Sequence, residues 1–184
     1  TTLFDLDDPR YRPFWALVAQ LDVPFYLHPR NPIPSWGKMY KGAEWLLGPK
    51  WAFGNETAVH ALRLMGSGLF DEHPDLKIII GHMGEGLPFF FQRLDILPQH
   101  VTKLKHPIQW YLRNNVHYTF SGMNFQSTFL NLFLELGGVD RMMFSADYPY
   151  QSMPEARAFL DQIPVSQEDR ERIAHGNAEK LFGL

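Results

Sequence analysis

Cysteine is absent from this sequence of 184 residues. Its absence excludes disulfide bonds, thiolate ligands and a thiol nucleophile, so any metal ion must be held by His, Asp or Glu. No apolar run approaches the roughly 20 residues of a membrane span, and no charged segment followed by an apolar one resembles a signal peptide. We therefore expect a cytoplasmic protein without a membrane partner.

Long runs of positive charge are also missing. The 17 Lys and Arg residues stand against 20 Asp and Glu, which gives a formal net charge of −3, and no basic run could follow a phosphate backbone. We expect no nucleic acid partner. Hydrophobic residues make up 45% of the chain, enough for the core of one folded unit, so we predict a single domain over residues 1–184.

Four segments have the continuous apolar character of strands that are covered on both faces. They are residues 23–27 (VPFYL), 76–81 (LKIIIG), 116–120 (VHYTF) and 141–146 (RMMFSA). The opening residues 1–14 (TTLFDLDDPRYRPF) are predicted to be loop-like.

Helical patterns lie between and after these strands, at residues 55–70, 88–97 and 125–138. In the first of them, Val59, Leu62 and Met65 recur at a spacing that keeps one helix face apolar. Two more helices are predicted to begin after Ser152 and Ser166, each followed three residues later by an acidic residue as in a capping box.

Alternating strands and helices predict parallel β/α units, because a parallel pair needs a crossover connection. Either a doubly wound sheet or a (β/α) barrel fits this order. No GxGxxG or Walker motif follows a strand, so the nucleotide-binding folds have no direct support.

Polar residues follow all four predicted strands. His28, His82, Ser121 and Asp147 stand at these positions, and the carboxyl ends of parallel strands converge on the face that holds the active site of barrels. A single His after a strand more often caps or packs, and an Asp before Tyr-Pro can make a turn. Three ionisable residues at equivalent positions are harder to explain in this way, because burying an unpaired charge is costly. The pattern favours a site that binds a divalent ion such as Zn²⁺ or Mn²⁺.

Two further features have a functional and a structural interpretation. Glu85 could orient the imidazole of His82 or cap the next helix. The long segment after His28 is rich in aromatic residues, including Trp36, and could cover a pocket or form a subunit contact. The remaining histidines, at positions 60, 73, 100, 106, 117 and 175, are interpreted as structural.

The segments YLHPRNP, IIIGHMGEGLPFFFQRLD, FSADYPY and HGNAEKLFGL together resemble the amidohydrolase-related decarboxylases, and among them the 2,3-dihydroxybenzoate and γ-resorcylate decarboxylases. The resemblance implies a (β/α)8 barrel with one divalent ion, Zn²⁺ or Mn²⁺ rather than Mg²⁺. It makes His28 and Asp147 metal ligands, with Asp147 also able to deliver a proton. It makes His82 and Glu85 the acid/base pair.

Substrate binding is also implied by the resemblance. Arg93 matches an arginine that serves the site or the subunit contact, and Trp36 and Tyr148 are the aromatic candidates for holding a flat ring. Members of the family are commonly dimers or tetramers, so a homodimer or homotetramer is expected.

One feature departs from the family. Its first metal ligands come from a Glu-x-His or His-x-His triplet, and no such triplet occurs in these 184 residues. We therefore expect the chain to cover the C-terminal half of the barrel, with the N-terminal strands absent.

The implied reaction is the non-oxidative decarboxylation of a hydroxybenzoate such as 2,3-dihydroxybenzoate. The metal would chelate the carboxylate and the ortho oxygen while the carbon that carries the carboxylate is protonated. Two alternatives stay open. One is a one-metal hydrolase of a small cyclic substrate; a two-metal hydrolase is disfavoured because no Lys follows any strand. The other is a barrel half without catalytic activity.

Overall fold

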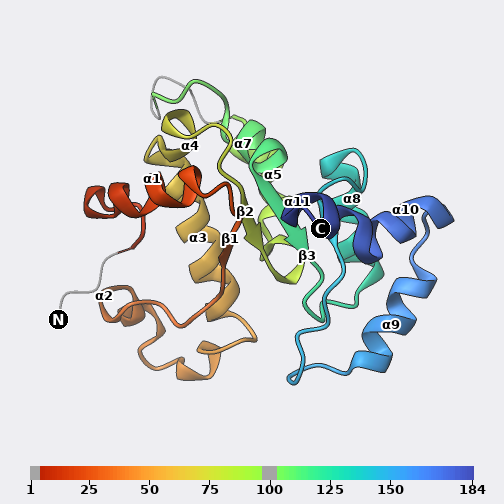
Figure 1. Cartoon of the computed structure of the whole chain (residues 1–184). Helices are drawn as coiled ribbons and strands as arrows, with labels where there is room; N and C mark the ends of the chain where they lie inside the picture. Colours follow the sequence, from red (N-terminus) through yellow and green to blue (C-terminus); the bar gives the residue numbers. More distant parts are fainter. Residues whose placement is uncertain (1–4, 97–102) are drawn as a thin grey trace.

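The computed structural model describes residues 5–96 and 103–184. Figure 1 shows the described part as a small central sheet with helices around it.

The strands are β1 (Phe25–Leu27), β2 (Ile78–Ile80), β3 (Val116–Thr119) and β4 (Met142–Met143). The longer helices are α1 (Arg12–Gln20), α3 (Ala52–Gly66), α5 (Leu87–Leu94), α7 (Ile108–Asn114), α8 (Gln126–Leu136) and α9 (Met153–Gln162). The shorter ones are α2 (Pro34–Gly37), α4 (Leu69–Glu72), α10 (Gln167–Glu171) and α11 (Asn177–Phe182), and a π-helical turn (Arg172–Gly176) joins the last two. Further single turns are Pro9–Tyr11, Lys38–Tyr40, Glu44–Leu46 and His82–Gly84.

The four strands form one parallel sheet in the order β1-β2-β3-β4. All four predicted strands are therefore present, although each is shorter than its apolar segment. Leu27, Ile80, Tyr118 and Met142 stand in register across the sheet and are buried. They belong to the same core as Trp15 of α1 and Phe129 of α8.

Two of the longer helices were not expected from the sequence. Helix α1 begins within the opening residues 1–14 that we predicted to be loop-like, and it buries Trp15 completely. Helix α7 precedes β3 and buries Tyr111 and Leu112. The predictions at Leu97 and His100 lie outside the described residues.

The buried face of α3 also differs from the predicted one. Met65 is buried, but Val59 is 38% exposed, and the helix turns the polar residues Glu56 and His60 inward instead. Apolar spacing was a poor guide here because the buried face of α3 is partly made of ionic contacts.

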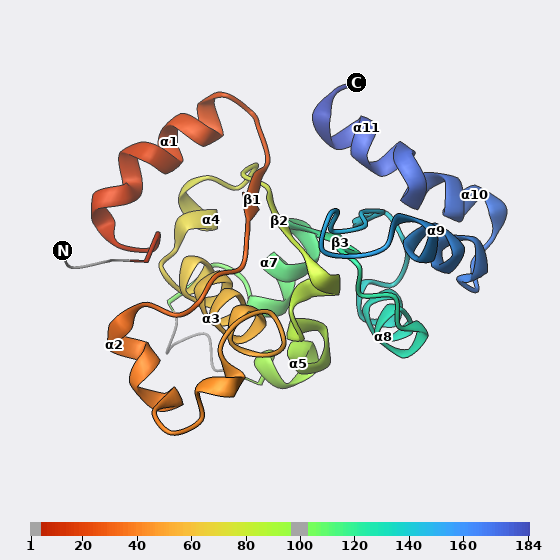
Figure 2. The same ribbon diagram turned by 90° about the horizontal axis from the view of Figure 1, so that it is seen from below.

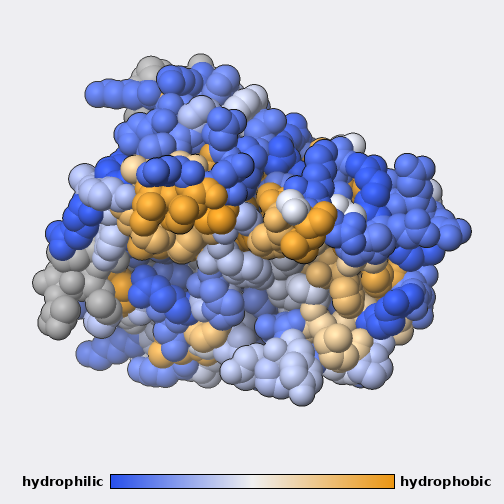
Figure 3. Space-filling model, in the orientation of Figure 1, coloured by the Kyte–Doolittle hydropathy of each residue, from blue (hydrophilic) through white to orange (hydrophobic). Residues whose placement is uncertain are grey.

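Apolar surface remains on the face seen in Figure 3, over α1 and beside α11. Exposed apolar side chains on and next to these two elements are Leu17, Leu21, Val23, Phe182 and Leu184. Among the described residues, no helix combines the length and the apolar character needed to cross a membrane.

Candidate active site

The carboxyl ends of β2 and β4 bring three predicted site residues together. Nδ1 of His82 lies 2.6 Å from Oε1 of Glu85, and Nε2 of the same ring lies 3.9 Å from Oδ2 of Asp147. The Glu85 side chain is only 6% exposed, whereas those of His82 and Asp147 are 23% and 26% exposed. The arrangement is an imidazole held on one side by a buried carboxylate and facing a second, more accessible carboxylate on the other.

The backbone of these residues is unusual. Residues 82–86 all have positive φ, with 48° at His82 and 53° at Glu85, and Asp147 has a φ of 64°. Ser121, at the end of β3, has a φ of 45°. Side chains other than glycine rarely adopt this region, and such strain gathers at functional sites because the surrounding structure must hold it. The strained positions coincide with the strand ends that the sequence pattern identified.

The pKa of His82 reflects its two carboxylate neighbours. Burial opposes the charged ring, but the hydrogen bond to Glu85 and the negative charges of Glu85 and Asp147 outweigh it, so the pKa is raised above the ordinary value. The imidazolium form is thereby favoured, with Nδ1–H donating to Glu85.

Glu85 also lies beside α3. A Cβ added to Gly54 would lie 2.7 Å from Oε2 of Glu85, so the carboxylate would have to shift to make room for it. The sequence gives no sign of Gly54, because its closeness to Glu85 exists only in the folded chain.

His28 follows β1 directly and is exposed, with its ring 6.3 Å from that of Tyr26. Asp147 has no Lys or Arg nitrogen within 4 Å among the described residues, and its nearest charged neighbour is His82. An accessible imidazole and a carboxylate without a cationic partner are donors that suit Zn²⁺ or Mn²⁺. Both predicted ligands thus have the chemistry for the expected ion.

A different trio lies close enough to share a cation. In the described part of the chain, ligand atoms of Asp5, Glu56 and His60 lie within 4.8 Å of one another. However, Nη2 of Arg30 already lies 3.3 Å from Asp5 and 3.2 Å from Glu56. The Leu6 N–H donates to Nε2 of His60 at 3.0 Å. We interpret the trio as an ionic contact that ties α3 to the segment after β1.

The three predicted substrate-binding residues lie in different surroundings. Arg93 is an exposed residue of α5 and lines an apolar cavity of about 400 Å³ between α3 and α5. Trp36 is half-buried in α2 with the guanidinium of Arg63 5.3 Å above its ring. Tyr148 is adjacent to Asp147 in the chain and is 77% exposed. The substrate-binding roles of Arg93, Trp36 and Tyr148 stay predictions.

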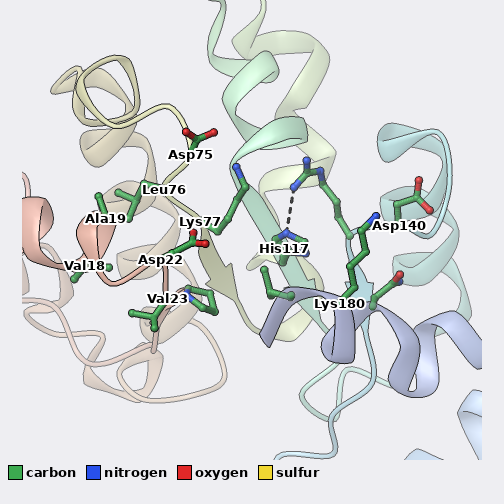
Figure 4. Close-up of a pocket in the computed structure, with 14 residues that line it drawn as sticks. Val18, Ala19, Asp22, Val23, Asp75, Leu76, Lys77, His117, Asp140 and Lys180 are labelled. Carbon is green, nitrogen blue, oxygen red and sulfur yellow. Dashed lines mark hydrogen bonds between the residues drawn. The ribbon is translucent and has the colours of Figure 1, made fainter. Parts of the chain in front are cut away.

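A larger cavity, of about 610 Å³, lies at the opposite ends of the strands. Figure 4 shows Asp22 and Val23 approaching it from the side of α1 and β1, and Lys180 from α11 on the other side. Ligands of parallel α/β folds bind at the carboxyl ends of the strands, not at these amino ends. We therefore place the candidate site at the His82 end.

Comparisons with known proteins show the family of the chain. A sequence model of the family described as amidohydrolase matches residues 2–184. A γ-resorcylate decarboxylase of Polaromonas sp. (strain JS666) is 50% identical over 97% of the chain and 56% of its own length. The chain thus spans about half the length of the curated relatives it matches.

Solved structures give the same picture. A 2,6-dihydroxybenzoate decarboxylase in complex with 2,6-dihydroxybenzoate superposes with a TM-score of 0.93 at 48% identity, covering 100% of this chain and 58% of that one. A dihydroxybenzoic acid decarboxylase of Polaromonas sp. JS666, with bound manganese and the inhibitor 2-nitroresorcinol, gives a TM-score of 0.94 at 48% identity, with coverages of 100% and 57%. The predicted α/β fold, about half of an amidohydrolase barrel, is confirmed.

Proposed function

This chain belongs to the amidohydrolase family, and from that premise we propose that the protein carrying it is a metal-dependent decarboxylase of a hydroxybenzoate. The observation that carries the proposal is the His82, Glu85 and Asp147 constellation at the strand ends. It occurs in a chain about half identical to proteins named as decarboxylases. The reaction would be that of a carbon–carbon lyase.

The substrate we propose is 2,6-dihydroxybenzoate. The curated relative is named for γ-resorcylate, which is 2,6-dihydroxybenzoate, and one of the two solved structures is named for 2,6-dihydroxybenzoate. The other is named for a dihydroxybenzoic acid without an isomer. The 2,3-isomer, our example from the sequence, is named by none of the three.

The metal we propose is Mn²⁺ or Zn²⁺, with His28 and Asp147 as the ligands that this chain supplies. One related structure holds manganese. When bound, the ion would act as a Lewis acid that orients the carboxylate and stabilises negative charge on the ring.

The proton that the reaction needs can come from the His82 side of the site. Decarboxylation adds a proton to the ring carbon that carries the carboxylate. The carbon–carbon bond then breaks, CO₂ leaves, and the bonding electrons restore the aromatic ring. Glu85 keeps the imidazolium of His82 oriented, and Nε2 of this ring faces the Asp147 carboxylate at 3.9 Å. Either Asp147 or His82 is thus placed to donate.

The test is an assay of the whole protein, loaded with Mn²⁺ or Zn²⁺ and stripped by a chelator. Substrate loss and CO₂ release would be followed with 2,6- and 2,3-dihydroxybenzoate. We expect metal-dependent CO₂ release, faster with the 2,6-isomer. The variants His82→Asn and Asp147→Asn should each lose kcat/KM by about 100-fold or more, the usual contribution of a positioned acid or base. Asn suits position 82 because it tolerates positive φ.

Matched controls are His175→Asn and Asp161→Asn. These alter exposed residues whose side chains bond to Glu179 and Arg157, respectively. They should keep full activity. Unchanged turnover in both site variants would contradict the proposal. A metal-loaded protein that hydrolyses a cyclic substrate but releases no CO₂ would favour the hydrolase alternative, and a folded protein that binds no metal would favour the non-catalytic one.

A further inference from the structure

Four hydroxyl side chains meet directly beneath the candidate site. Oη of Tyr26 lies 2.8 Å from Oγ1 of Thr119 and 3.1 Å from Oγ of Ser121. Thr119 and Ser121 are 2.8 Å apart, and Oγ of Ser121 lies 3.1 Å from Oγ of Ser145. The backbone N–H of Ser121 also donates to Ser145 at 2.8 Å. We call these four residues the hydroxyl cluster.

The geometry of the cluster lets every hydroxyl be satisfied. Tyr26, Thr119 and Ser121 form a triangle in which each hydroxyl can donate once and accept once. Ser145 accepts from the backbone and can donate into the triangle. Thr119 and Ser121 are each only 6% exposed, whereas Tyr26 is 39% exposed. Hydrogen-bond networks hold their members rigidly where these are buried and paired, as at Thr119 and Ser121.

The cluster joins strands that are not neighbours. Tyr26 belongs to β1 and Thr119 to β3, and β2 lies between them in the sheet. The side chain of Tyr26 can reach across β2 because the residue directly after β2 is Gly81, which has no side chain. A Cβ at Gly81 would lie 2.8 Å from Oη of Tyr26 and 3.1 Å from Oγ of Ser121.

Gly81 is needed for space and not for its backbone conformation. Its φ of −74° and ψ of −175° are extended values that any residue adopts. We therefore infer that position 81 is glycine because the hydroxyls of Tyr26 and Ser121 lie too close for a Cβ there.

The cluster also stands next to both predicted metal ligands. Tyr26 precedes His28 by two residues, and Ser145 precedes Asp147 by two residues. The bonds from Tyr26 through Ser121 to Ser145 therefore link the chain segment that carries His28 to the segment that carries Asp147. These bonds connect β1 and β4 in addition to the ladder of the two strands between them.

We infer that the hydroxyl cluster positions His28 and Asp147 relative to each other for metal binding, with Tyr26 as its central positioning residue. This inference rests on the proposed function, because it concerns the same metal site. Removal of hydrogen-bond partners that support metal ligands commonly weakens metal binding by 10- to 100-fold. Since Tyr26 acts through the backbone of its neighbours, we expect a change at the lower end of that range.

The test is the Kd of Mn²⁺, measured by titration of the metal-free whole protein and followed by the EPR signal of free Mn²⁺. Tyr26→Phe removes one hydroxyl and keeps the ring, and we expect its Kd to rise by about tenfold. Ser145→Ala removes the other end of the cluster and should raise the Kd in the same direction. It also keeps the inference testable if Tyr26→Phe does not fold.

The matched control is Tyr118→Phe. This tyrosine also lies in the sheet and is fully buried, but its hydroxyl donates to the carbonyl of Leu112, away from the cluster. The control should lower thermal stability and leave the Kd of Mn²⁺ unchanged. A purely structural role for Tyr26 would produce this same pattern.

The outcomes separate the two proposals. An unchanged Kd in both Tyr26→Phe and Ser145→Ala overturns the inference, whatever the activity. A parent protein that binds Mn²⁺ without releasing CO₂ overturns the proposed function, while a raised Kd in the variants would still support the positioning role. A parent protein that binds no Mn²⁺ overturns both.

Discussion

His82, Glu85 and Asp147 hold positive φ although none of them is glycine. Each such residue costs on the order of 1–3 kcal/mol and persists only where neighbouring contacts enforce it. Here the enforcing contacts are also those of the proposed chemistry, because the His82–Glu85 hydrogen bond spans the strained turn. At the scale of single residues, the positions of these side chains therefore depend on close contacts. We expect that larger neighbouring residues would disturb them.

Gly54→Ala tests this tolerance. The new methyl group would collide with Oε2 of Glu85, which cannot swing away freely while Oε1 is bonded to His82. We expect kcat/KM to fall by about tenfold, since small displacements of catalytic groups are costly. The free energy of unfolding should change little, because the strain at Glu85 offsets the advantage of up to about 1 kcal/mol that Ala has over Gly in a helix.

The control for Gly54→Ala is Gly66→Ala, in the same helix, where an added Cβ meets nothing within 4 Å. This variant should keep full activity. Urea unfolding and steady-state kinetics of both variants give the comparison, and full activity in Gly54→Ala would show that Glu85 is free to move.

His117 makes stability depend on pH. Burial, together with the charges of Arg141, Lys77 and Lys180 around the amino-end cavity, lowers the pKa of His117 to about 4. In the unfolded chain this pKa is about 6.5. The folded state therefore binds the proton more weakly, so this contribution to stability is complete above pH 6.5 and is lost as the pH falls toward 4.

Replacing His117 removes this dependence. Between pH 7 and pH 5, we expect the free energy of unfolding of the parent to fall by about 2 kcal/mol more than that of His117→Gln. Urea titrations at the two pH values measure the difference, and the exposed residue His175 provides the control as His175→Gln. If the free energy of unfolding fell equally in the parent and in His117→Gln, His117 would bind its proton as readily in the folded state as in the unfolded chain.

At the scale of elements, the strands and their polar ends could be predicted because buried parallel strands have a local apolar signature. The order of β/α units and the approach of His82 to Asp147 followed from that pattern. The hydroxyl cluster had a weaker signal: Tyr26 and Ser145 each stand two residues before a predicted ligand. That spacing becomes informative only when the curvature of the sheet brings β1 and β3 together.

The polar face of α3 had no such signal. Glu56 faces inward because Arg30, from another part of the chain, lies 3.2 Å from its carboxylate, and His60 faces inward because its Nε2 accepts from the N–H of Leu6. The spacing of apolar residues within one helix cannot show partners that lie elsewhere in the sequence.

The helix caps that the sequence predicted offer a test at this scale. Oγ of Ser166 accepts from the N–H of Asp169 at 3.1 Å at the start of α10, and Oγ of Ser152 accepts from that of Glu155 at 3.4 Å at the start of α9. Ser166→Ala should lower the free energy of unfolding by about 1 kcal/mol, because one N–H at the helix start loses its partner.

The longer bond predicts a smaller loss for Ser152→Ala than for Ser166→Ala. Ser166→Asp is the control, since Asp is an equally good capping residue and should retain the stability of the parent. Chemical unfolding of the three variants measures these differences, and equal stability of Ser166→Ala and the parent would show that the cap contributes nothing.

At the scale of the whole molecule, a metal ion shared by His28 and Asp147 would connect the two edge strands of the described sheet, β1 and β4. Figure 2 shows β1, β2 and β3 side by side, with β1 farthest from α11. Ligand binding to the folded state alone stabilises it by mass action, by about 2.7 kcal/mol at 100 times the Kd.

Metal removal should therefore lower the thermal unfolding temperature of the whole protein, and addition of Mn²⁺ should restore it. Asp147→Asn is expected to lose most of this response, whereas Asp161→Asn should keep it. Differential scanning calorimetry with and without chelator measures the shift. An undiminished Mn²⁺ response in Asp147→Asn would exclude this carboxylate as a ligand.

The predictions of a single domain, a homodimer or homotetramer and a cytoplasmic location also belong to this scale. They remain predictions. Light scattering of the purified protein would measure its oligomeric state.

By itself, the sequence determined the class of fold, the presence and order of the four strands, and which polar residues follow them. These depend on local apolar runs and on residue types, which are written in order along the chain. The tertiary structure decided which side chains touch: Gly54 against Glu85, Tyr26 across Gly81 to β3, and Arg30 between Asp5 and Glu56. Such contacts join distant parts of the chain. They require atoms to be placed to within a few tenths of an ångström, so they exist only once the packing is complete.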